Sequence, residues 1–298
     1  MKKEPFKEKD DRLRRTRLYI PGNHPAMIQN AEIYGADSLI FDLEDSIPLT
    51  EKDTARILVR NAIQALNFGR SEVTVRINGI NTPFLEKDLE AIVPTKPDGL
   101  LLPKAETEED ILFLHERITE LEKKHGLPVG KIRIMPIIET ALGVVNVEKI
   151  VAAPRIAAVG IGGEDLTADI GAIRTPDGRE LEYISSKIIV ACAAYHIQAI
   201  DTVFADINDQ EGLFQATKRA ISRGFQGKSV IHPSQIEVVH RAFMPSEEEI
   251  EKAKRIVKAY RESLKKGLGA VSVDGRMIDL PVVMRAERIL KRAKAWKK

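Results

Sequence analysis

The chain has 298 residues, which is enough for one large α/β domain or two small ones. Apolar residues make up 43% of it and charged residues 30%, a balance typical of a folded globular protein. Its 46 basic and 44 acidic residues nearly cancel and aromatic residues are 5%, which argues against nucleic-acid binding. Apolar runs are too short to span a bilayer, and the charged first residues predict no secretory signal. With a single cysteine, Cys192, we expect a cytoplasmic protein without membrane association.

A pattern of short apolar strand, polar turn and amphipathic helix recurs along most of the chain. The predicted strands are Leu18–Pro21, Ser38–Leu43, Glu72–Ile77, Gly99–Leu102, Ile132–Ile138, Ile156–Ile161, Ala199–Phe204 and Gly227–Ile231. The predicted helices include Pro25–Tyr34, Glu51–Leu66, Thr107–Lys124, Ser185–Ala194 and Glu211–Arg223. Eight strands alternating with helices in about 230 residues predict a (β/α)₈ TIM barrel over residues 12–240. A doubly wound sheet is the alternative, but it normally carries a glycine-rich phosphate loop, and the first loop, PGNHPAM, has none.

The pattern changes after the eighth strand. Glu247–Lys265 is typical of a long charged helix, GAVSVDGRMIDLP of a short hairpin around Asp274–Gly275, and Val282–Lys297 of a final basic helix. Because eight strands already close a barrel, we interpret residues 241–298 as a C-terminal extension. Its apolar residues need a surface to cover, and the barrel mouth of the same chain or of a neighbouring subunit would provide one.

Two strands in the middle of the chain each run towards a carboxylate. Ile132–Ile138 leads into Glu139, Ile156–Ile161 is followed shortly by Asp165, and the segment between the strands has the length of a crossover helix. Parallel strands joined in this way have their carboxyl ends on one side, where barrel enzymes have their active sites. Two hard oxygen ligands at neighbouring strand ends suit Mg²⁺. The alternative is a helix N-cap acid and a surface ion-pair acid.

Polar residues follow the other predicted strands and complete a ring that is rich in acids. They are Asn23, His24, Asp42, Glu44, Asp45, Arg76, Asn78, Lys104, Glu164, Asp206 and His232. Arg76 has apolar neighbours, so its guanidinium needs an acid or an anionic ligand, and both an ion pair with an acid of the second loop and a clamp on a substrate carboxylate fit. Nearby acids would keep Lys104 charged, against Schiff-base chemistry. His232 fits a structural hydrogen bond or a catalytic role.

Eight motifs occur in order along nearly the whole chain. They are RRTRLYIPGN, LIFDLEDSI, VRIN, LLPKAE, PIIETALGV, GGEDLTADIG, GKSVIHPSQI and DGRMIDLP. Together they resemble the citrate lyase beta-subunit (CitE-like) family, which is related to malyl-CoA and citramalyl-CoA lyases. The resemblance extends from about Arg14 to Leu290. The fold that it implies, a (β/α)₈ barrel with a C-terminal extension, agrees with the pattern of strands and helices.

The resemblance also implies functions for particular residues. Glu139 and Asp165 match the family's Mg²⁺ ligands, which hold the substrate through the metal, and Arg76 matches the arginine that holds the oxo acid. Asp279, in MIDLP, matches an acid that reaches the site of a neighbouring subunit in the CoA-dependent relatives. The chain would therefore form a homo-oligomer.

A thioester carrier is the implied partner, either CoA or the arm of an acyl-carrier protein. Arg15 and Arg17 in RRTR, and Lys228 and His232 in GKSVIHP, match regions near that carrier. The resemblance also points to the alpha and gamma subunits of citrate lyase as further partners.

The implied reaction is cleavage of a citryl-type 3-hydroxy-acyl thioester to oxaloacetate and an acetyl thioester. Mg²⁺ and Arg76 would stabilise the charge that develops on the hydroxyl oxygen. Glu44 and Asp45 are candidates for the base, and Asp279 for the proton donor to the thioester enolate. Backbone N–H groups of the GGED loop, which includes Gly163 and Glu164, would hold the carboxylate. The alternatives are a stand-alone malyl-CoA or citramalyl-CoA lyase or synthase, a Mg²⁺-dependent aldolase on free hydroxy-oxo acids, and a non-catalytic scaffold subunit.

Overall fold

The computed structural model describes residues 12–175, 177–265 and 267–296. The chain divides into two compact units, residues 1–239 and residues 240–298. Among the helices that the structure describes, none is both long enough and apolar enough to cross a membrane. The predicted end of the final helix, Lys297, lies outside the described residues.

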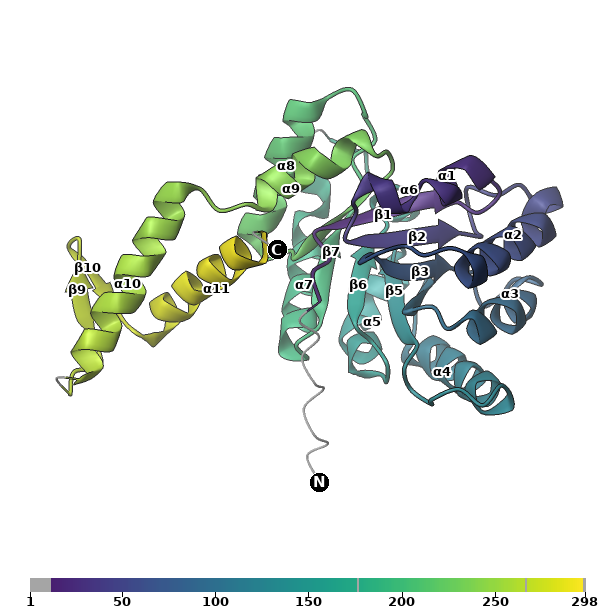
Figure 1. Ribbon diagram of the computed structural model, residues 1–298, viewed down its shortest axis with the longest axis horizontal. Helices are drawn as coiled ribbons and strands as arrows, with labels where there is room; N and C mark the ends of the chain where they lie inside the picture. Colours follow the sequence, from purple (N-terminus) through teal and green to yellow (C-terminus); the bar gives the residue numbers. More distant parts are fainter. Residues whose placement is uncertain (1–11, 176, 266, 297–298) are drawn as a thin grey trace. The chain divides into compact units, whose positions relative to one another are not determined.

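Eight parallel strands close a barrel in the first unit (Figure 1). They are β1 (Thr16–Pro21), β2 (Ser38–Asp42), β3 (Glu72–Arg76), β4 (Gly99–Leu102), β5 (Arg133–Ile138), β6 (Ala158–Ile161), β7 (Gln198–Asp201) and β8 (Gly227–Val230). Each strand pairs with the next along the chain, and β8 closes the barrel by pairing with β1. The predicted (β/α)₈ barrel is therefore confirmed.

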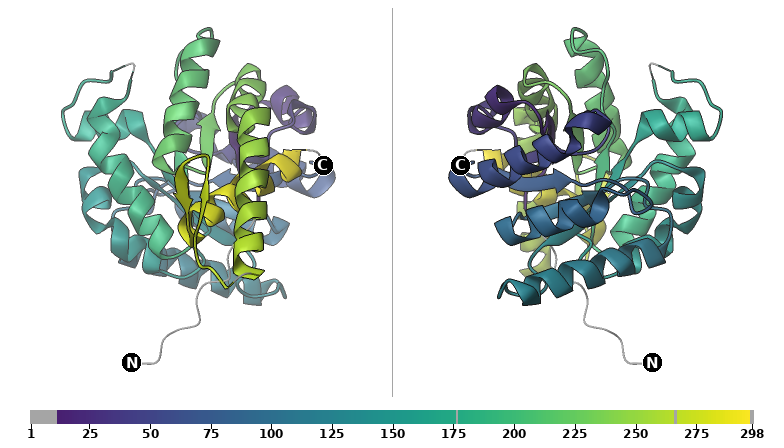
Figure 2. Two further views of the ribbon diagram at one scale, coloured as in Figure 1. Left: turned by 90° about the vertical axis from the view of Figure 1, so that its left-hand side faces the viewer. Right: turned by 90° about the vertical axis from the view of Figure 1, so that its right-hand side faces the viewer.

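Helices connect the strands and surround the barrel, as the two side views show (Figure 2). They are α1 (Pro25–Gln29), α2 (Lys52–Ala65), α3 (Leu85–Ile92), α4 (Glu108–Lys124), α5 (Ala141–Ala152), α6 (Gly163–Asp169), α7 (Glu182–Ala194), α8 (Gln210–Arg223) and α9 (Ser234–Phe243), with 3₁₀ turns at Glu32–Tyr34, Leu49–Glu51, Val93–Thr95 and Arg179–Leu181. The sequence analysis did not single out α3, α6 and α9. These are short, and charged residues interrupt the apolar pattern of α3 and α6.

Apolar side chains fill the barrel interior. Ile40, Leu101, Met135 and Ile200, from four different strands, pack in one cluster, and Tyr19 packs against it. Strands β2 and β4 are buried along their whole length, because one face meets this cluster and the other meets the helices. The predicted strand bounds agree with the observed ones to within two residues, except at β7, which ends at Asp201 rather than at residue 204.

Buried ion pairs lie at the amino ends of the strands, away from the loops that follow the strands. Arg14 donates two hydrogen bonds to Glu72, at 2.7 and 2.6 Å, and both side chains are 1% exposed. Arg15 donates two to Asp37, the residue before β2, at 2.7 Å each. Bidentate pairs of this kind fix the register of neighbouring strands. In barrel enzymes this end of the strands serves stability rather than chemistry.

The second unit consists of two helices and a hairpin. α10 (Glu247–Lys265) packs along α11 (Leu280–Trp296), and β9 (Val271–Val273) pairs antiparallel with β10 (Arg276–Ile278) around the predicted turn (Figure 1). Asp274 and Gly275 both have positive φ, at 51° and 74°, as a two-residue hairpin turn requires. The small core of this unit joins both helices and the hairpin, with members such as Val257, Ile278 and Val283.

Candidate active site

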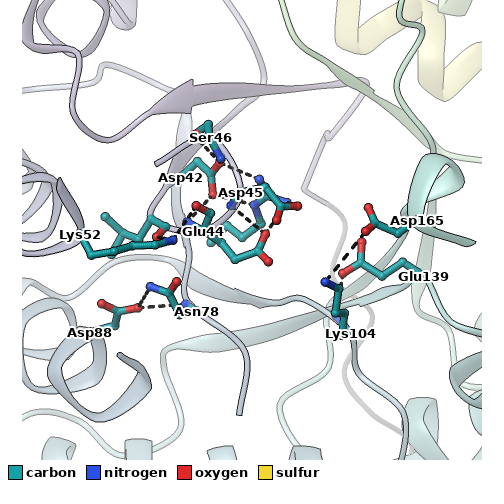
Figure 3. A network of polar contacts seen from close by, with 12 residues as sticks. Asp42, Glu44, Asp45, Ser46, Lys52, Asn78, Asp88, Lys104, Glu139 and Asp165 are labelled. Atoms are coloured by element: carbon teal, nitrogen blue, oxygen red, sulfur yellow. Dashed lines mark hydrogen bonds and ion pairs between the residues drawn. The ribbon is translucent and has the colours of Figure 1, made fainter. Parts of the chain in front are cut away.

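Glu139 and Asp165 lie at the carboxyl ends of the neighbouring strands β5 and β6. Glu139 follows β5 directly and is 3% exposed, whereas Asp165 lies in the first turn of α6 and is half-buried. Figure 3 shows both carboxylates directed to the same space, beside Lys104. The fold thus brings together the two residues that the sequence analysis proposed as metal ligands.

Lys104 contacts both carboxylates. Its backbone N–H donates a 2.7 Å hydrogen bond to Glu139 Oε1, and its Nζ lies 3.9 Å from Asp165 Oδ1. Lys104 also has a φ of 48°, which is uncommon for a residue other than glycine and often marks a functional site. The loop after β4 therefore orients Glu139 through its backbone and leaves a half-exposed ammonium beside Asp165.

Burial raises the pKa of Glu139 to about 7. The hydrogen bond from Lys104 opposes this change, while the negative charges of Asp165 and Glu44 add to it. A carboxylate that is held against such repulsion is stabilised by a cation placed between it and its acidic neighbour. The electrostatics therefore favour a bound cation at this pair.

Gly162 is necessary at the end of β6 because Glu139 occupies the space beside it. A Cβ atom at residue 162 would lie 2.2 Å from Glu139 Oε2 and 2.5 Å from Glu139 Cβ. The φ of Gly162 is −91°, which any residue can adopt, so the close approach rather than the backbone conformation requires glycine. The first glycine of the GGED motif therefore shapes the carboxylate pair.

Arg76, the last residue of β3, binds the acids that follow β2. Its Nε and Nη2 donate to the two oxygens of Asp42 at 2.6 Å each, and its Nη1 lies 2.9 Å from Glu44 Oε2 and 3.4 Å from Asp45 Oδ2. Burial alone would lower the pKa of Arg76, but the bonds to Asp42 outweigh it and raise the pKa. Burial likewise acts to raise the pKa of Asp42, and Arg76 reverses this and lowers it. Arg76 is thus permanently charged and held in one orientation.

Glu44 and Asp45 differ in environment although they are adjacent. The Glu44 side chain is 11% exposed, and burial raises its pKa to about 7 against the opposing effect of Arg76. The Asp45 side chain is 54% exposed. A carboxyl group with a pKa near neutrality suits proton transfer at neutral pH, so Glu44 has the chemistry of a candidate base.

Tyr19 and Lys52 belong to this site, although the sequence analysis did not single them out. The Arg76 guanidinium carbon lies 5.1 Å from the centre of the Tyr19 ring, a cation–π arrangement at the floor of the site. Lys52, the first residue of α2, binds the backbone of the loop that carries Glu44. The sequence does contain a signal for Tyr19, because its position two residues before the end of β1 is on the inward face of the strand. Nothing in the sequence distinguishes Lys52 from a surface lysine.

Two of the four residues predicted to bind the thioester carrier, Arg15 and Arg17, lie away from the carboxyl ends of the strands. Arg15 pairs with Asp37 at the amino ends of the strands. Arg17 is 1% exposed inside the barrel, where Nη2 lies 3.1 Å from the sulfur of Met135. Lys228 is 2% exposed, and its Nζ binds Asp201 Oδ2 at 2.6 Å and Thr202 O at 3.0 Å, at the carboxyl end of β7. The positions of Arg15 and Arg17 correct the prediction for these two residues, while a function of Lys228 in carrier binding stays a prediction.

His232 is the fourth of these residues, and it is exposed directly after β8 at the carboxyl end. Its Nδ1 lies 2.7 Å from Ser234 Oγ and accepts the Ser234 N–H at 3.2 Å, so it caps the start of α9. This contact leaves Nε2 of the ring for a ligand. The structural hydrogen bond that the sequence analysis weighed is present, and a function in carrier binding stays a prediction.

Two groups of the GGED loop have protein partners. The Gly163 N–H donates to Thr202 Oγ1 at 3.0 Å, and the Glu164 carboxylate accepts from Arg174 Nε at 3.0 Å. The Gly163 N–H is therefore bonded within the protein, while binding of the substrate carboxylate by the Glu164 backbone N–H stays a prediction. Of the charged residues in this loop, Asp165 is the one that faces Glu139.

Asp279 lies between β10 and α11 in the second unit. It is half-buried, its carbonyl oxygen accepts from Val283 N at 3.1 Å, and its Oδ1 lies 3.4 Å from Val282 N. The carboxylate therefore sits at the start of α11 as a cap.

The donor set at Glu139 and Asp165 fits Mg²⁺. Among the described residues no group of three or more acids, histidines or cysteines could enclose a metal ion, so a site here would have to rest on a pair such as this one. Mg²⁺ is usually held by one or two carboxylates and keeps waters or substrate oxygens in its other positions. The acid pair leaves room for such ligands because Asp165 is half-buried rather than enclosed.

The chain is a TIM barrel with paired carboxylates and a fixed arginine at the carboxyl ends of its strands. This combination is typical of barrel enzymes whose active site in the barrel mouth can hold a metal ion. Residues 15–233 match the model of the HpcH/HpaI aldolase/citrate lyase family, and the chain belongs to this family.

Relatives match along nearly the whole chain. The citrate lyase subunit beta of Leuconostoc mesenteroides subsp. cremoris is 46% identical over 287 residues, which cover 96% of this chain and 95% of that protein. The mitochondrial citramalyl-CoA lyase of Rattus norvegicus is 34% identical over 288 residues, which cover 93% of this chain and 85% of that protein. The crystal structure of CitE from Mycobacterium tuberculosis, in complex with magnesium, acetoacetate and coenzyme A, has a TM-score of 0.80 at 33% identity and covers 94% of this chain and 98% of that one.

Proposed function

We propose that the chain is a Mg²⁺-dependent carbon–carbon lyase that acts as a citrate lyase beta subunit. It would cleave a citryl-type 3-hydroxy-acyl thioester to oxaloacetate and an acetyl thioester. The observation that carries this proposal is that the charges of Asp165, Glu44 and Arg76 all act on Glu139, which puts the four residues in one site. The chain is also 46% identical to a citrate lyase subunit beta. The magnesium, acetoacetate and coenzyme A in the CitE complex support the same chemistry.

Glu139 and Asp165 would hold Mg²⁺. When bound, the ion supplies a Lewis acid for the substrate's carboxylate and hydroxyl oxygens. Arg76 turns its Nη1 towards the same region and would stabilise the negative charge on the hydroxyl oxygen as it becomes a ketone. Asp42 keeps the guanidinium in this orientation.

The Glu44 carboxylate accepts the hydroxyl proton in this proposal. The oxygen's electron pair then forms the carbonyl bond, and the adjacent carbon–carbon bond breaks. The electrons of that bond stay on the carbon next to the thioester carbonyl, which gives an enolate. The enolate takes a proton to give the acetyl thioester. Asp279 of a neighbouring copy is the proposed donor of that proton. Asp45 stays the alternative base.

The carrier is a CoA or acyl-carrier-protein thioester in this proposal. His232, which is exposed shortly after β8, would contact the carrier. A homo-oligomer, contact with citrate lyase alpha and gamma subunits, and a cytoplasmic location complete the proposal. The barrel unit over residues 12–240 would carry the chemistry, and the extension would complete the site.

Acetyl-thioester release measured with citryl-CoA, malyl-CoA and citramalyl-CoA, each with and without Mg²⁺, tests the proposal. We expect release from citryl-CoA that requires Mg²⁺. Preference for citramalyl-CoA would favour the second candidate, which the 34% identical citramalyl-CoA lyase supports. Cleavage of free hydroxy-oxo acids but of no thioester would indicate an aldolase, and no turnover would indicate a scaffold subunit.

A further inference from the structure

Lys52 is buried beside the loop of residues 43–46, here called the acidic loop. Its Nζ donates hydrogen bonds to the backbone oxygens of Leu43 at 2.8 Å and of Glu44 at 2.6 Å, and the residue is 5% exposed (Figure 3). The Phe84 ring lies on another side, with its centre 5.8 Å from Nζ. The ammonium is therefore enclosed between a helix start, an aromatic ring and two carbonyl groups.

Carbonyl oxygens rather than carboxylates satisfy this ammonium. Within the described part of the chain Lys52 forms no ion pair, although the charges of Glu44, Asp42 and Asp88 all act on it. Asp88 is occupied elsewhere, because it accepts from Asn78 and Arg56. Lys52 thus supplies positive charge to the acids of the site without occupying the carboxylates that face the mouth.

Asp42 also holds the acidic loop. The two oxygens of Asp42 accept from Glu44 N at 2.9 Å and from Ser46 N at 3.1 Å, and the same carboxylate binds Arg76. Lys52 and Asp42 therefore bind different groups of the loop backbone, Lys52 two carbonyl oxygens and Asp42 two N–H groups. The Glu44 carboxylate meets Arg76 Nη1 at 2.9 Å and accepts from Asp45 N at 3.0 Å.

We propose that Lys52 is a positioning residue for the lyase reaction, which holds the acidic loop so that the Glu44 carboxylate stays beside Arg76 while substrate binds. This inference rests on the proposed function, because it assigns Lys52 a task in that reaction. Bound substrate oxygens would compete with Glu44 for Arg76. A fixed loop backbone limits the resulting movement to the Glu44 side chain, so that the base remains within reach of the hydroxyl group.

The experiment compares Lys52→Met, Lys52→Arg and, as a matched control, Lys87→Met. Lys87 has a side chain that is 62% exposed and contacts Asp53 at 4.0 Å, so its variant removes a lysine charge without touching the loop. The measurements are kcat and KM with citryl-CoA and Mg²⁺, and hydrogen–deuterium exchange of the amides of residues 43–46. Thermal melting confirms that each variant is folded at the assay temperature.

Lys52→Met should lower kcat roughly tenfold or more, because small misplacements of catalytic groups have effects of this size. Its KM should change little, since Lys52 does not touch substrate, and exchange in the acidic loop should accelerate. Lys52→Arg should retain part of the parent kcat and part of the loop's protection from exchange, because a guanidinium can donate to two carbonyls. Lys87→Met should behave as the parent.

Parent-like kcat and loop exchange in Lys52→Met would overturn the inference. An equal loss of kcat in Lys52→Met and Lys52→Arg would also overturn the inference, because it would indicate that Lys52 serves general packing. A parent chain that cleaves none of the thioesters overturns the proposed function and this inference with it, and the parent alone reveals that outcome.

Discussion

Arg76 forms the ion pair that the sequence analysis weighed, and the clamp on a substrate carboxylate stays a proposal. One edge of its guanidinium, Nε and Nη2, binds Asp42, while Nη1 faces Glu44 and Asp45 at the opposite side. In the proposed clamp, a substrate carboxylate would meet Nη1 in competition with Glu44 and Asp45. The planar fork of arginine allows this division between its edges, because its donors are fixed relative to each other.

Arg76→Lys should lower kcat/KM by roughly tenfold or more, since one ammonium cannot replace both edges and a charged hydrogen bond contributes about 1.5–3 kcal/mol. Steady-state kinetics with citryl-CoA measure this loss. Arg117→Lys is the control, because Arg117 also binds a carboxylate through Nε and Nη2, that of Glu86, outside the mouth. Full activity in Arg76→Lys would reduce Arg76 to a structural ion pair.

Glu139→Gln and Asp165→Asn should each abolish Mg²⁺-dependent turnover and weaken Mg²⁺ binding by on the order of 100-fold or more, since even indirect partners of metal ligands have effects of 10–100-fold. Titration calorimetry with Mg²⁺ reports the binding directly. Glu86→Gln, which removes a carboxylate far from the pair, should bind Mg²⁺ as the parent does. Normal Mg²⁺ affinity in either site variant would remove that residue from the ligand set.

The end of β6 shows how a strand terminus can determine a site. Gly162 leaves space for Glu139, and a methyl group there would overlap its carboxylate. Gly160 lies two residues earlier, within β6, and a Cβ there would meet nothing closer than Ile137 Cγ1 at 3.9 Å. The two positions are both glycine but differ in what lies beside them.

Gly162→Ala should therefore displace the Glu139 carboxylate and weaken Mg²⁺ binding, whereas Gly160→Ala should leave it near the parent value. The same calorimetric titration compares the two variants. Circular dichroism establishes that both retain the barrel. Equal Mg²⁺ affinity in the two variants would show that Glu139 does not need its observed position.

A buried ion pair joins α4 to the amino ends of β5 and β6. Arg155 donates to Glu122 at 3.0 and 2.6 Å and to His115 Nδ1 at 2.8 Å, and Glu122 is fully buried. Burial acts to raise the pKa of Glu122, but the bonds from Arg155 and from the Gly130 N–H outweigh it and lower the pKa. The pair thus stabilises the ionised form in the folded state.

Glu122→Gln should destabilise the protein by about 3 kcal/mol near neutral pH, because it leaves a buried guanidinium without its counter-charge. The folded-state pKa is below the unfolded value of about 4.3, so the contribution is complete above that pH and is lost as the pH falls through the folded pKa. Urea unfolding at several pH values measures this. Glu120→Gln, on the exposed side of α4, should change little, and a pH-independent difference would contradict the assignment.

At the scale of the whole molecule, Asp279 tests whether sites are shared between copies. Asp279→Asn removes the carboxylate while keeping a side chain that caps helices well, so α11 should remain stable. We expect it to bind Mg²⁺ and a 2-oxo acid but to lose lyase activity. Mixing it with inactive Glu139→Gln should restore part of the activity, because hybrid oligomers then pair an intact metal site with an intact Asp279.

Activity after co-refolding the two variants, with subunit exchange confirmed by native mass spectrometry, decides this question. No recovery despite exchange would place Asp279 in the site of its own chain or outside the chemistry. The single variants, assayed alone at the same concentration, are the controls for recovery.

The sequence by itself determined the barrel, the hairpin at Asp274–Gly275 and the positions of Glu139, Asp165 and Arg76. These follow from local rules, because strand periodicity, turn residues and the common side of parallel strand ends are visible along the chain. Only the tertiary structure decided which polar residues face the site. Arg17 and Lys228 look like surface cations in the sequence, yet both are buried, and Lys52 binds two loop carbonyls that no local pattern reveals. The physical reason is that burial and pairing depend on side chains from distant strands, which the barrel brings together only when it closes.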